Sequence, residues 1–240
     1  MRSLLAREIA RRVKGGEVIG IGSGTTVELA VREIGRRIRE ERLEFSAIAT
    51  SSRIERIADE EGVRLLSPAS NVPISWAFDG ADEVDPELNL LKGRGGAMLF
   101  EKVVAKRSSR FVVIVDEAKL VGTVGDKHRV PVEVLPFALP FVRASLESLG
   151  AVEIELLESG DKYGPVYTDS GNFILDLRFE CFRPTLEEEL KKITGVVESG
   201  LFIGYMPEVL VASGDGLTSR SLVGGRVVDR VVNRVAAGGA

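Results

Sequence analysis

In the first half of the chain, short apolar runs alternate with segments in which apolar residues recur every three or four positions. Strands are predicted where short apolar runs occur, at residues 17–21, 45–50, 63–66, 74–79 and 111–115. Helices are predicted where apolar residues recur every three or four positions, at residues 4–13, 26–41, 52–61 and 96–106. Because strands that alternate with helices usually form a parallel sheet covered on both faces, this half predicts an α/β fold.

Helix ends and faces can also be predicted. Ser3 is expected to cap the first helix, and the Ser52-x-x-Glu55 pattern to form a capping box at the third. The second helix is expected to bury its apolar side, which consists of Val27, Leu29, Ala30, Ile34 and Ile38.

The pattern changes near residue 130, where VPVEVLPFALPF carries three prolines within ten residues. Beyond this boundary we expect strands at 152–156, 172–176 and 196–202, with helices at 140–149 and 185–193. Such a block predicts a small α+β domain at 130–206, inserted into a main domain of residues 1–129 and 207–240. A further strand at 208–212 could return to the main sheet, and residues 226–235 fit either a basic amphipathic helix or a strand extension.

Composition excludes several functional classes. The 36 acidic and 32 basic residues nearly balance, which argues against a nucleic-acid partner. The single cysteine, Cys181, allows no intramolecular disulfide, and the single histidine, His128, is expected to be a loop residue. No apolar run approaches the ~20 residues that span a bilayer. The sequence therefore predicts a cytoplasmic protein without a membrane partner.

The segment GIGSGTT (residues 20–26) lies between a predicted strand and a predicted helix. A loop at a helix N-terminus offers backbone N–H groups and the positive end of the helix dipole, so a phosphate is a natural ligand. The segment matches neither the dinucleotide fingerprint GxGxxG nor a P-loop. A tight βα turn without a ligand is the alternative interpretation.

Residues 79–102 read DGADEVDPELNLLKGRGGAMLFEK and combine three features. Four acids lie within seven residues (Asp79, Asp82, Glu83 and Asp85), Lys92 precedes a glycine-rich loop, and Glu101 follows within a helix-like run. The acids could form a magnesium or calcium site, but their spacing is not that of an EF-hand loop. A site that moves protons on a charged substrate could use all three features.

These motifs occur in the order seen in one family. GIGSGTT, TSS at 50–52, DGADEVDP, LKGRGGAMLFEKVVA, VDEAKLV and PVEVLPFA are followed by GNFILD and GLFIG. The chain thus resembles the type A ribose-5-phosphate isomerases. The resemblance implies a Rossmann-like parallel-sheet domain with a smaller inserted α+β (ferredoxin-like) domain. It also implies a homodimer or homotetramer that interconverts D-ribose 5-phosphate and D-ribulose 5-phosphate, in the non-oxidative branch of the pentose phosphate pathway, with no metal or organic cofactor.

The resemblance further implies roles for individual residues. Glu101 resembles the general base that moves a proton between C2 and C1, while Asp79, Asp82 and Lys92 match positions that assist ring opening and hold the sugar oxygens. The implied substrate-binding residues are Gly22, Ser23, Gly24, Thr25, Thr26, Gly80, Ala81, Gly93, Arg94, Gly95, Gly96 and Lys119. Arg94 stands where many members have glycine, and it could contact the substrate or point to solvent.

Proton transfer next to a carbonyl gives these roles a physical basis. The enediolate intermediate is negatively charged, so a base and oxyanion donors are both needed. Glu101 would become a better base if it were buried among its apolar helix neighbours Met98, Leu99, Phe100, Val103 and Val104.

Three other functions remain compatible with such a fold. A non-catalytic sugar-phosphate sensor should carry a DNA-binding module and would not need both Lys92 and Glu101. An amino-sugar phosphate deaminase relies on a histidine in the site, whereas His128 lies elsewhere in the sequence. A CoA transferase needs a nucleophilic glutamate and a groove for CoA.

Overall fold

The structure is a computed structural model that describes residues 1–160 and 163–234. It divides into two compact units, each of which is described by itself. The first contains Met1–Gly80, Val103–Leu120 and Tyr205–Ala240, and the second contains Ala81–Lys102 and Val121–Gly204.

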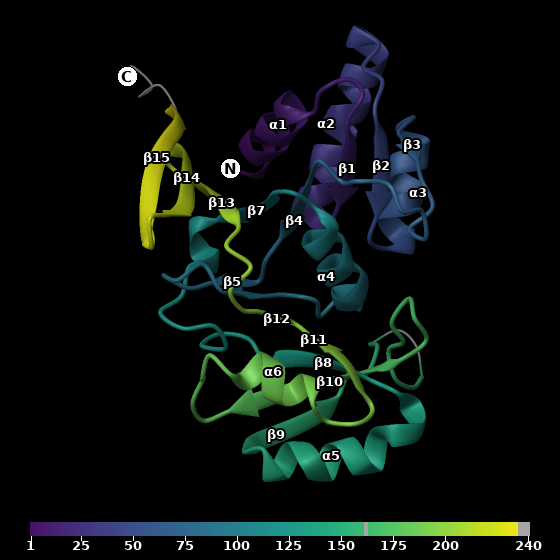
Figure 1. The fold of residues 1–240 in the computed structure, drawn as a ribbon, viewed down its shortest axis with the longest axis vertical. Helices are drawn as coiled ribbons and strands as arrows, with labels where there is room; N and C mark the ends of the chain where they lie inside the picture. The colour runs from purple at the N-terminus through teal and green to yellow at the C-terminus, as the bar shows by residue number, and fades with distance from the viewer. Residues whose placement is uncertain (161–162, 235–240) are drawn as a thin grey trace. The chain divides into compact units, whose positions relative to one another are not determined.

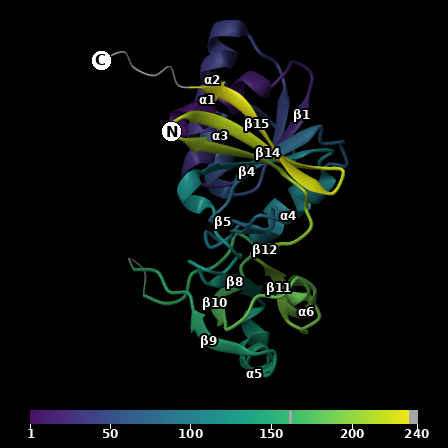
Figure 2. The same ribbon diagram turned by 90° about the vertical axis from the view of Figure 1, so that its left-hand side faces the viewer.

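An eight-stranded sheet, ordered β15-β14-β13-β7-β4-β1-β2-β3, forms the centre of the first unit. Its strands are β1 (Val18–Ile21), β2 (Ser46–Ala49), β3 (Arg64–Leu65), β4 (Trp76–Gly80), β7 (Phe111–Asp116), β13 (Glu208–Ser213), β14 (Gly216–Val223) and β15 (Arg226–Arg234). The six strands from β13 to β3 run parallel, and β14 and β15 add an antiparallel hairpin, drawn in yellow in Figure 2. The predicted strand at 208–212 therefore does return to the main sheet.

Helices cover both faces of this sheet. The unit contains α1 (Arg2–Arg12), α2 (Thr25–Glu41), α3 (Ser52–Glu60), the end of α4 (Met98–Arg107) and the short 3₁₀ helix η1 (Glu117–Lys119). Residues of α1, α2 and α3 share one apolar core with Ile19 and Ile21 of β1. On the opposite face, a Cβ added to Gly20 would lie 2.3 Å from Val104 of α4, so that helix packs directly on the strand.

Two predicted helix caps and one buried position are wrong. Helix α1 begins before Ser3, and α3 is capped by Ser51, whose side chain accepts a hydrogen bond from the Ile54 N–H group. In α2, Leu29 is 40% exposed, because the buried stripe runs through Val27, Ala30, Val31 and Ile34 instead.

The second unit is built on an antiparallel sheet ordered β11-β8-β10-β9. Its elements are β8 (Val130–Val134), the 3₁₀ helix η2 (Pro136–Ala138), α5 (Leu139–Ser148), β9 (Ala151–Leu156), β10 (Phe173–Phe179), α6 (Leu186–Lys191) and β11 (Val196–Ser199). Val142 and Leu146 of α5 share the core of this unit with the strand residues, and Figure 1 shows α5 running along the sheet. The mostly parallel sheet and this smaller antiparallel sheet confirm the predicted α/β fold with a small α+β part.

A three-stranded sheet in the second unit was not predicted. It pairs β5 (Glu83–Val84), β6 (Leu90–Leu91) and β12 (Leu201–Phe202). This pairing connects residues 81–102 to the second unit through main-chain hydrogen bonds. The unit therefore also includes Ala81–Lys102 and residues 121–129, which the sequence assigned to the main domain.

The last two predictions concern residues 226–235 and membrane-spanning helices. Of the alternatives for residues 226–235, the structure shows a strand over Arg226–Arg234, and residue 235 lies outside the described residues. None of the helices in the described part of the chain is long and apolar enough to cross a bilayer.

Candidate active site

Three loops of the first unit meet at one edge of its sheet. Strands β1, β4 and β7 are neighbours and parallel, so their carboxyl ends lie together. The GSGTT loop follows β1, Asp79 and Gly80 end β4, and Lys119 lies in η1 just after β7. In open α/β sheets this edge is where ligands bind.

The GSGTT loop is fixed against Asp79. The Gly22 N–H group donates to the Phe78 carbonyl at 2.8 Å, and the Ser23 N–H group donates to Asp79 Oδ1 at 3.0 Å. A Cβ on Gly22 would lie 2.1 Å from Asp79 Cγ, so only glycine allows this approach. The Gly80 N–H group donates to the same Asp79 oxygen at 2.7 Å, which gives the carboxylate one orientation.

The loop also has the features of a phosphate site. Ser23 Oγ lies 2.7 Å from Ser51 Oγ and 3.0 Å from Thr50 Oγ1, so the TSS segment belongs to the same hydroxyl cluster. Gly24, which has no side chain that could cap the helix, precedes Thr25 at the start of α2. The first turn of α2 can therefore direct its N–H groups and the positive end of the helix dipole toward an anion.

In the second unit, Lys92 and Glu101 form a buried ion pair. Each residue is 4% exposed, and Lys92 Nζ contacts Glu101 Oε2. Glu101 lies in the first turn of α4, and Lys92 directly follows β6. An unpaired charge is costly out of water, and here each side chain compensates the charge of the other. The fold thus holds an acid and a base in direct contact at low solvent exposure.

The predicted surroundings of Glu101 are only partly correct. Met98 and Val104 are buried, as expected, but Phe100 is 38% and Val103 is 44% exposed. Phe100 and Val103 lie on a different side of α4 from Glu101, because residues one or two positions apart on a helix do not share a face. Glu101 therefore shares its side of α4 with Met98 and Val104 and not with Phe100 and Val103.

The glycine-rich loop joins β6 to α4 and is closed by its own turn. The Gly96 N–H group donates to the Gly93 carbonyl at 3.0 Å. Arg94 is 61% exposed at its side chain, but its Nε lies 3.0 Å from Oδ2 of the buried Asp176 in β10. Burial raises the pKa of Asp176, while the positive charges of Arg94 and Arg129 act in the opposite direction. Arg94 thus does not simply point to solvent.

The four clustered acids have different surroundings. Glu83 is fully buried and accepts hydrogen bonds from the N–H groups of Gly125 at 2.6 Å and Lys127 at 2.9 Å, and its Oε1 lies 2.9 Å from His128 Nδ1. Asp85 accepts the Asn89 N–H group at 2.8 Å and the Asn89 amide at 2.9 Å. Both acids therefore stabilise turns, and His128 is the loop residue that the sequence predicts.

Asp82 is the remaining acid of this segment. It is half-buried, and its N–H group donates to the Leu91 carbonyl at 2.8 Å. Within residues 1–160 and 163–234, no group of three or more His, Cys, Asp or Glu side chains is arranged to hold a metal ion.

Sequence reasoning missed three residues: Phe202, which lies against Lys92, Lys102, which lies against the same ring, and Asp176, which contacts Arg94. Each lies in a motif that the sequence contains, namely the EK pair at 101–102, GNFILD and GLFIG. The motifs could have drawn attention to them, but the contacts that give them a role are formed only in the fold.

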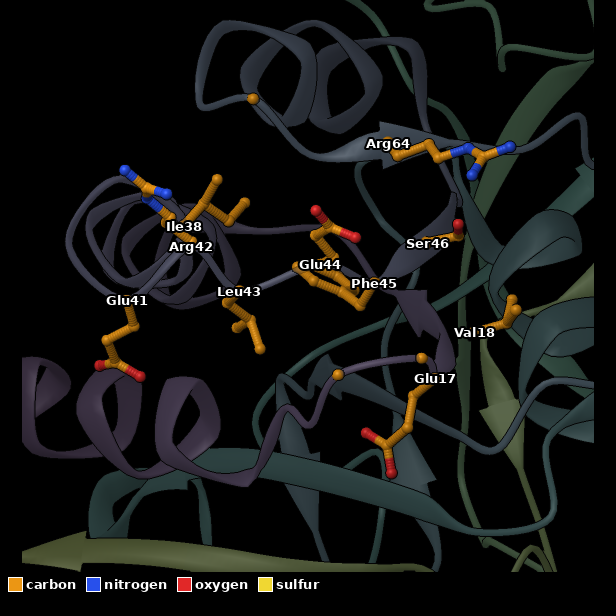
Figure 3. Close-up of a pocket in the computed structure, with 13 residues that line it drawn as sticks. Glu17, Val18, Ile38, Glu41, Arg42, Leu43, Glu44, Phe45, Ser46 and Arg64 are labelled. Carbon is orange, nitrogen blue, oxygen red and sulfur yellow. The ribbon is translucent and has the colours of Figure 1, made fainter.

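A hollow elsewhere on the first unit does not coincide with these residues. It lies at the amino ends of β1, β2 and β3, where Glu17, Ser46 and Arg64 line it (Figure 3). None of the predicted site residues lines it. Because the strands are parallel, their amino ends lie at the sheet edge opposite the GSGTT loop.

Comparison with known proteins identifies relatives over nearly the whole chain. The sequence model of the family described as ribose 5-phosphate isomerase A (phosphoriboisomerase A) matches residues 46–216. Ribose-5-phosphate isomerase A of Methanothermobacter thermautotrophicus is 41% identical over 219 residues, which cover 90% of this chain and 96% of the relative.

Solved structures agree with this match. Ribose 5-phosphate isomerase A from Methanocaldococcus jannaschii is 40% identical and superposes with a TM-score of 0.86, covering 92% of this chain and 97% of that one. A D-ribose-5-phosphate isomerase in complex with phospho-erythronic acid is 35% identical, with a TM-score of 0.88 and the same coverage. These relatives define the class of protein, an isomerase built on a mostly parallel α/β sheet. The chain belongs to the ribose 5-phosphate isomerase A family.

Proposed function

We propose that this protein interconverts D-ribose 5-phosphate and D-ribulose 5-phosphate, with Glu101 as the general base. The observation that carries the proposal is the buried contact between Glu101 and Lys92, in a chain that belongs to this isomerase family. A solved relative in complex with phospho-erythronic acid, a phosphorylated sugar acid, supports a sugar phosphate as the substrate.

Glu101 and Lys92 are suited to the two demands of the proton transfer. In the open-chain aldose, Glu101 would take the proton from C2, and the electron pair would form a C1–C2 double bond with negative charge on the oxygens. Glu101 would then return the proton to C1 while the O2 proton moves to O1, which leaves the ketose. The Lys92 ammonium would stabilise the oxyanion at low solvent exposure, where such a contact is worth most.

Ring opening requires a second acid–base group, and we propose Asp79 or Asp82 for it. Asp79 is held in one orientation by the Ser23 and Gly80 N–H groups. An oriented carboxylate can exchange a proton with a sugar hydroxyl without first losing side-chain freedom.

We propose that the substrate's phosphate binds the GSGTT loop, at the N-terminus of α2 and with Lys119. The remaining substrate contacts that we propose come mainly from backbone groups, namely those of Gly22, Gly24, Gly80, Ala81, Gly93, Arg94, Gly95 and Gly96, together with the side chains of Ser23, Thr25 and Thr26. Backbone N–H groups in glycine-rich loops can approach phosphate and sugar oxygens closely.

The central test is turnover of ribose 5-phosphate in excess EDTA by the wild-type protein and by Glu101→Gln. We expect the wild type to remain active in EDTA, and Glu101→Gln to fold normally but lose roughly 10²–10⁴-fold in kcat, the contribution of a general base. The matched control is Glu55→Gln, which changes an exposed glutamate of α3. Near-normal turnover by Glu101→Gln would refute the assignment of the base, and loss of wild-type activity in EDTA would restore the metal hypothesis for the acidic segment.

Assembly and location belong to the same proposal. We propose a homodimer or homotetramer in the cytoplasm. Light scattering of the purified protein at several concentrations would measure the mass of the assembly, and a monomer at all of them would contradict this part.

A further inference from the structure

The GLFIG segment (residues 200–204) runs against the backbone of Lys92. The Lys92 N–H group donates to the Gly200 carbonyl at 2.9 Å. A Cβ on Gly200 would lie 2.0 Å from the Lys92 carbonyl oxygen, so glycine is required for this approach. The GLFIG segment therefore fixes where the Lys92 side chain begins.

The same segment also contacts the end of the Lys92 side chain. Phe202 is fully buried, and Lys92 Nζ lies 5.4 Å from the centroid of its ring. Lys102 Nζ lies 5.1 Å from the same centroid. One aromatic ring thus interacts with two ammonium groups, both within the ~6 Å range in which the negative ring face attracts a cation.

Main-chain hydrogen bonds at Phe202 and at the two residues after it fix the backbone that carries the ring. Phe202 pairs with Leu90 where β12 joins β6. The next N–H group, that of Ile203, donates to Glu187 Oε2 at 2.7 Å, and the Gly204 N–H group donates to Asn89 Oδ1 at 3.2 Å. A ring fixed in this way can restrict a flexible side chain that lies against it.

Carboxylates balance the second ammonium group. Lys102 is 2% exposed and contacts Glu187 at 2.5 Å and Glu198 at 2.8 Å. Because two negative charges surround Lys102, it adds no net positive charge next to Lys92. Glu187 contacts both Lys102 and the backbone after Phe202, so this ion cluster also supports the position of the ring.

We propose that Phe202 is a positioning residue for Lys92. Its ring holds the buried ammonium in the charged form and in the orientation that meets Glu101 and the oxyanion. This role rests on the proposed isomerase function, and Phe202 acts through Lys92 without touching the reacting atoms. Burial alone would disfavour the ammonium form, and the lysine side chain has four rotatable bonds, so both charge and orientation need support.

The test replaces Phe202 by mono-, di- and trifluorophenylalanine through non-canonical incorporation. Fluorination withdraws negative potential from the ring face but changes its shape little, whereas Phe202→Leu would change packing and charge at once. We expect kcat for ribose 5-phosphate to fall stepwise with each fluorine, by roughly tenfold at the trifluoro ring. KM and the thermal unfolding midpoint should stay near those of the wild type.

Two controls separate this role from a structural one. Trifluorophenylalanine at Phe137, which is 99% exposed, controls for incorporation. Lys106→Met removes the ammonium group of a different lysine, whose Nζ lies 5.6 Å from the Tyr205 ring centroid. Both should keep kcat within about twofold of wild type, well below the tenfold loss expected from a working cation–π contact.

Three outcomes would decide against the role. A constant kcat across the series, with or without a change in the unfolding midpoint, would show that the ring only fills space. Equal losses in the Lys106→Met control would show that the effect is not specific to the ammonium group of Lys92. A wild-type protein that does not isomerise ribose 5-phosphate would overturn the proposed function and this role with it, and that result is distinguishable from an active enzyme with a flat series.

Discussion

Acidic residues that are neighbours in the sequence have different roles because their side chains meet different partners. Asp79 faces the N–H groups of the GSGTT loop, whereas Glu83, only four positions further, is enclosed by the 125–128 turn. At the scale of single residues, the partner defines the role more than the residue type does. Arg94 is the clearest example, since a buried carboxylate gives it a contact that the sequence does not reveal.

At this scale we expect Arg94→Gly to affect the loop more than substrate affinity. The variant would leave Asp176 buried without its cationic partner, which should lower the stability by about 1 kcal/mol, since the arginine itself is largely exposed. Urea unfolding and the KM for ribose 5-phosphate measure the two effects. Arg94→Lys is the control, and a tenfold or larger rise in KM with unchanged stability would show that Arg94 binds substrate directly.

At the scale of elements, a buried side chain can stabilise a turn that has no regular secondary structure of its own. The β5–β6 hairpin and the 125–128 turn are short, and Glu83 joins them by accepting backbone N–H groups from Gly125 and Lys127. Backbone N–H groups and carboxylates are costly to leave unpaired inside a protein. The hairpin also places Lys92, which follows β6 directly.

The corresponding prediction concerns Glu83→Gln. A glutamine at this fully buried position would direct an N–H₂ group toward backbone donors, so we expect a loss of roughly 1–3 kcal/mol in the free energy of unfolding. Equilibrium urea denaturation is the measurement, and Glu87→Gln, on the exposed part of the same segment, is the control. An unchanged midpoint in Glu83→Gln would mean that the turn is held by other contacts.

At the scale of the whole molecule, one carboxylate links several parts of the first unit. Glu208 in β13 accepts hydrogen bonds from Arg12 of α1 at 3.0 Å, from Ser219 of β14 at 2.8 Å and from Arg110 next to β7. Burial acts to raise the pKa of Glu208, but these donors outweigh it and lower the pKa from 4.5 to about 2.

This shift predicts how acid affects stability. Because the pKa of Glu208 is lower in the folded than in the unfolded protein, its contribution is present above pH 4.5 and is lost as the pH falls toward about 2. The lowering corresponds to at most about 3 kcal/mol at neutral pH. Urea midpoints of wild type and Glu208→Gln should therefore differ clearly at pH 7 and converge near pH 2.

Glu60→Gln, which changes an exposed glutamate of α3, is the control for this comparison. A gap between wild type and Glu208→Gln that stays constant from pH 7 to pH 2 would show that the carboxylate's charge is not the cause.

Local patterns were enough to predict most elements of the main sheet, whereas the roles of the candidate site residues come from the family resemblance and stay predictions. The helix over Thr25–Glu41 follows from periodicity and the buried strand Phe111–Asp116 from a continuous apolar run, because an apolar helix face or an apolar strand has few other ways to leave water. The wrong predictions concern positions where two neighbouring residues are about equally favourable by local sequence. Ser51 and Ser52 are equally good caps by composition, and only the path of the chain selects Ser51.

The sequence by itself determined the α/β class, the family and the types of side chain available for proton transfer. Only the tertiary structure decided that Lys92 contacts Glu101, that Glu83 and Asp85 support turns, and that the Phe202 ring interacts with two ammonium groups. The physical reason is the distance along the sequence over which each interaction acts. Periodicity and capping act over a few residues, whereas the contacts of charged side chains join positions up to 196 residues apart and are set when the whole chain packs.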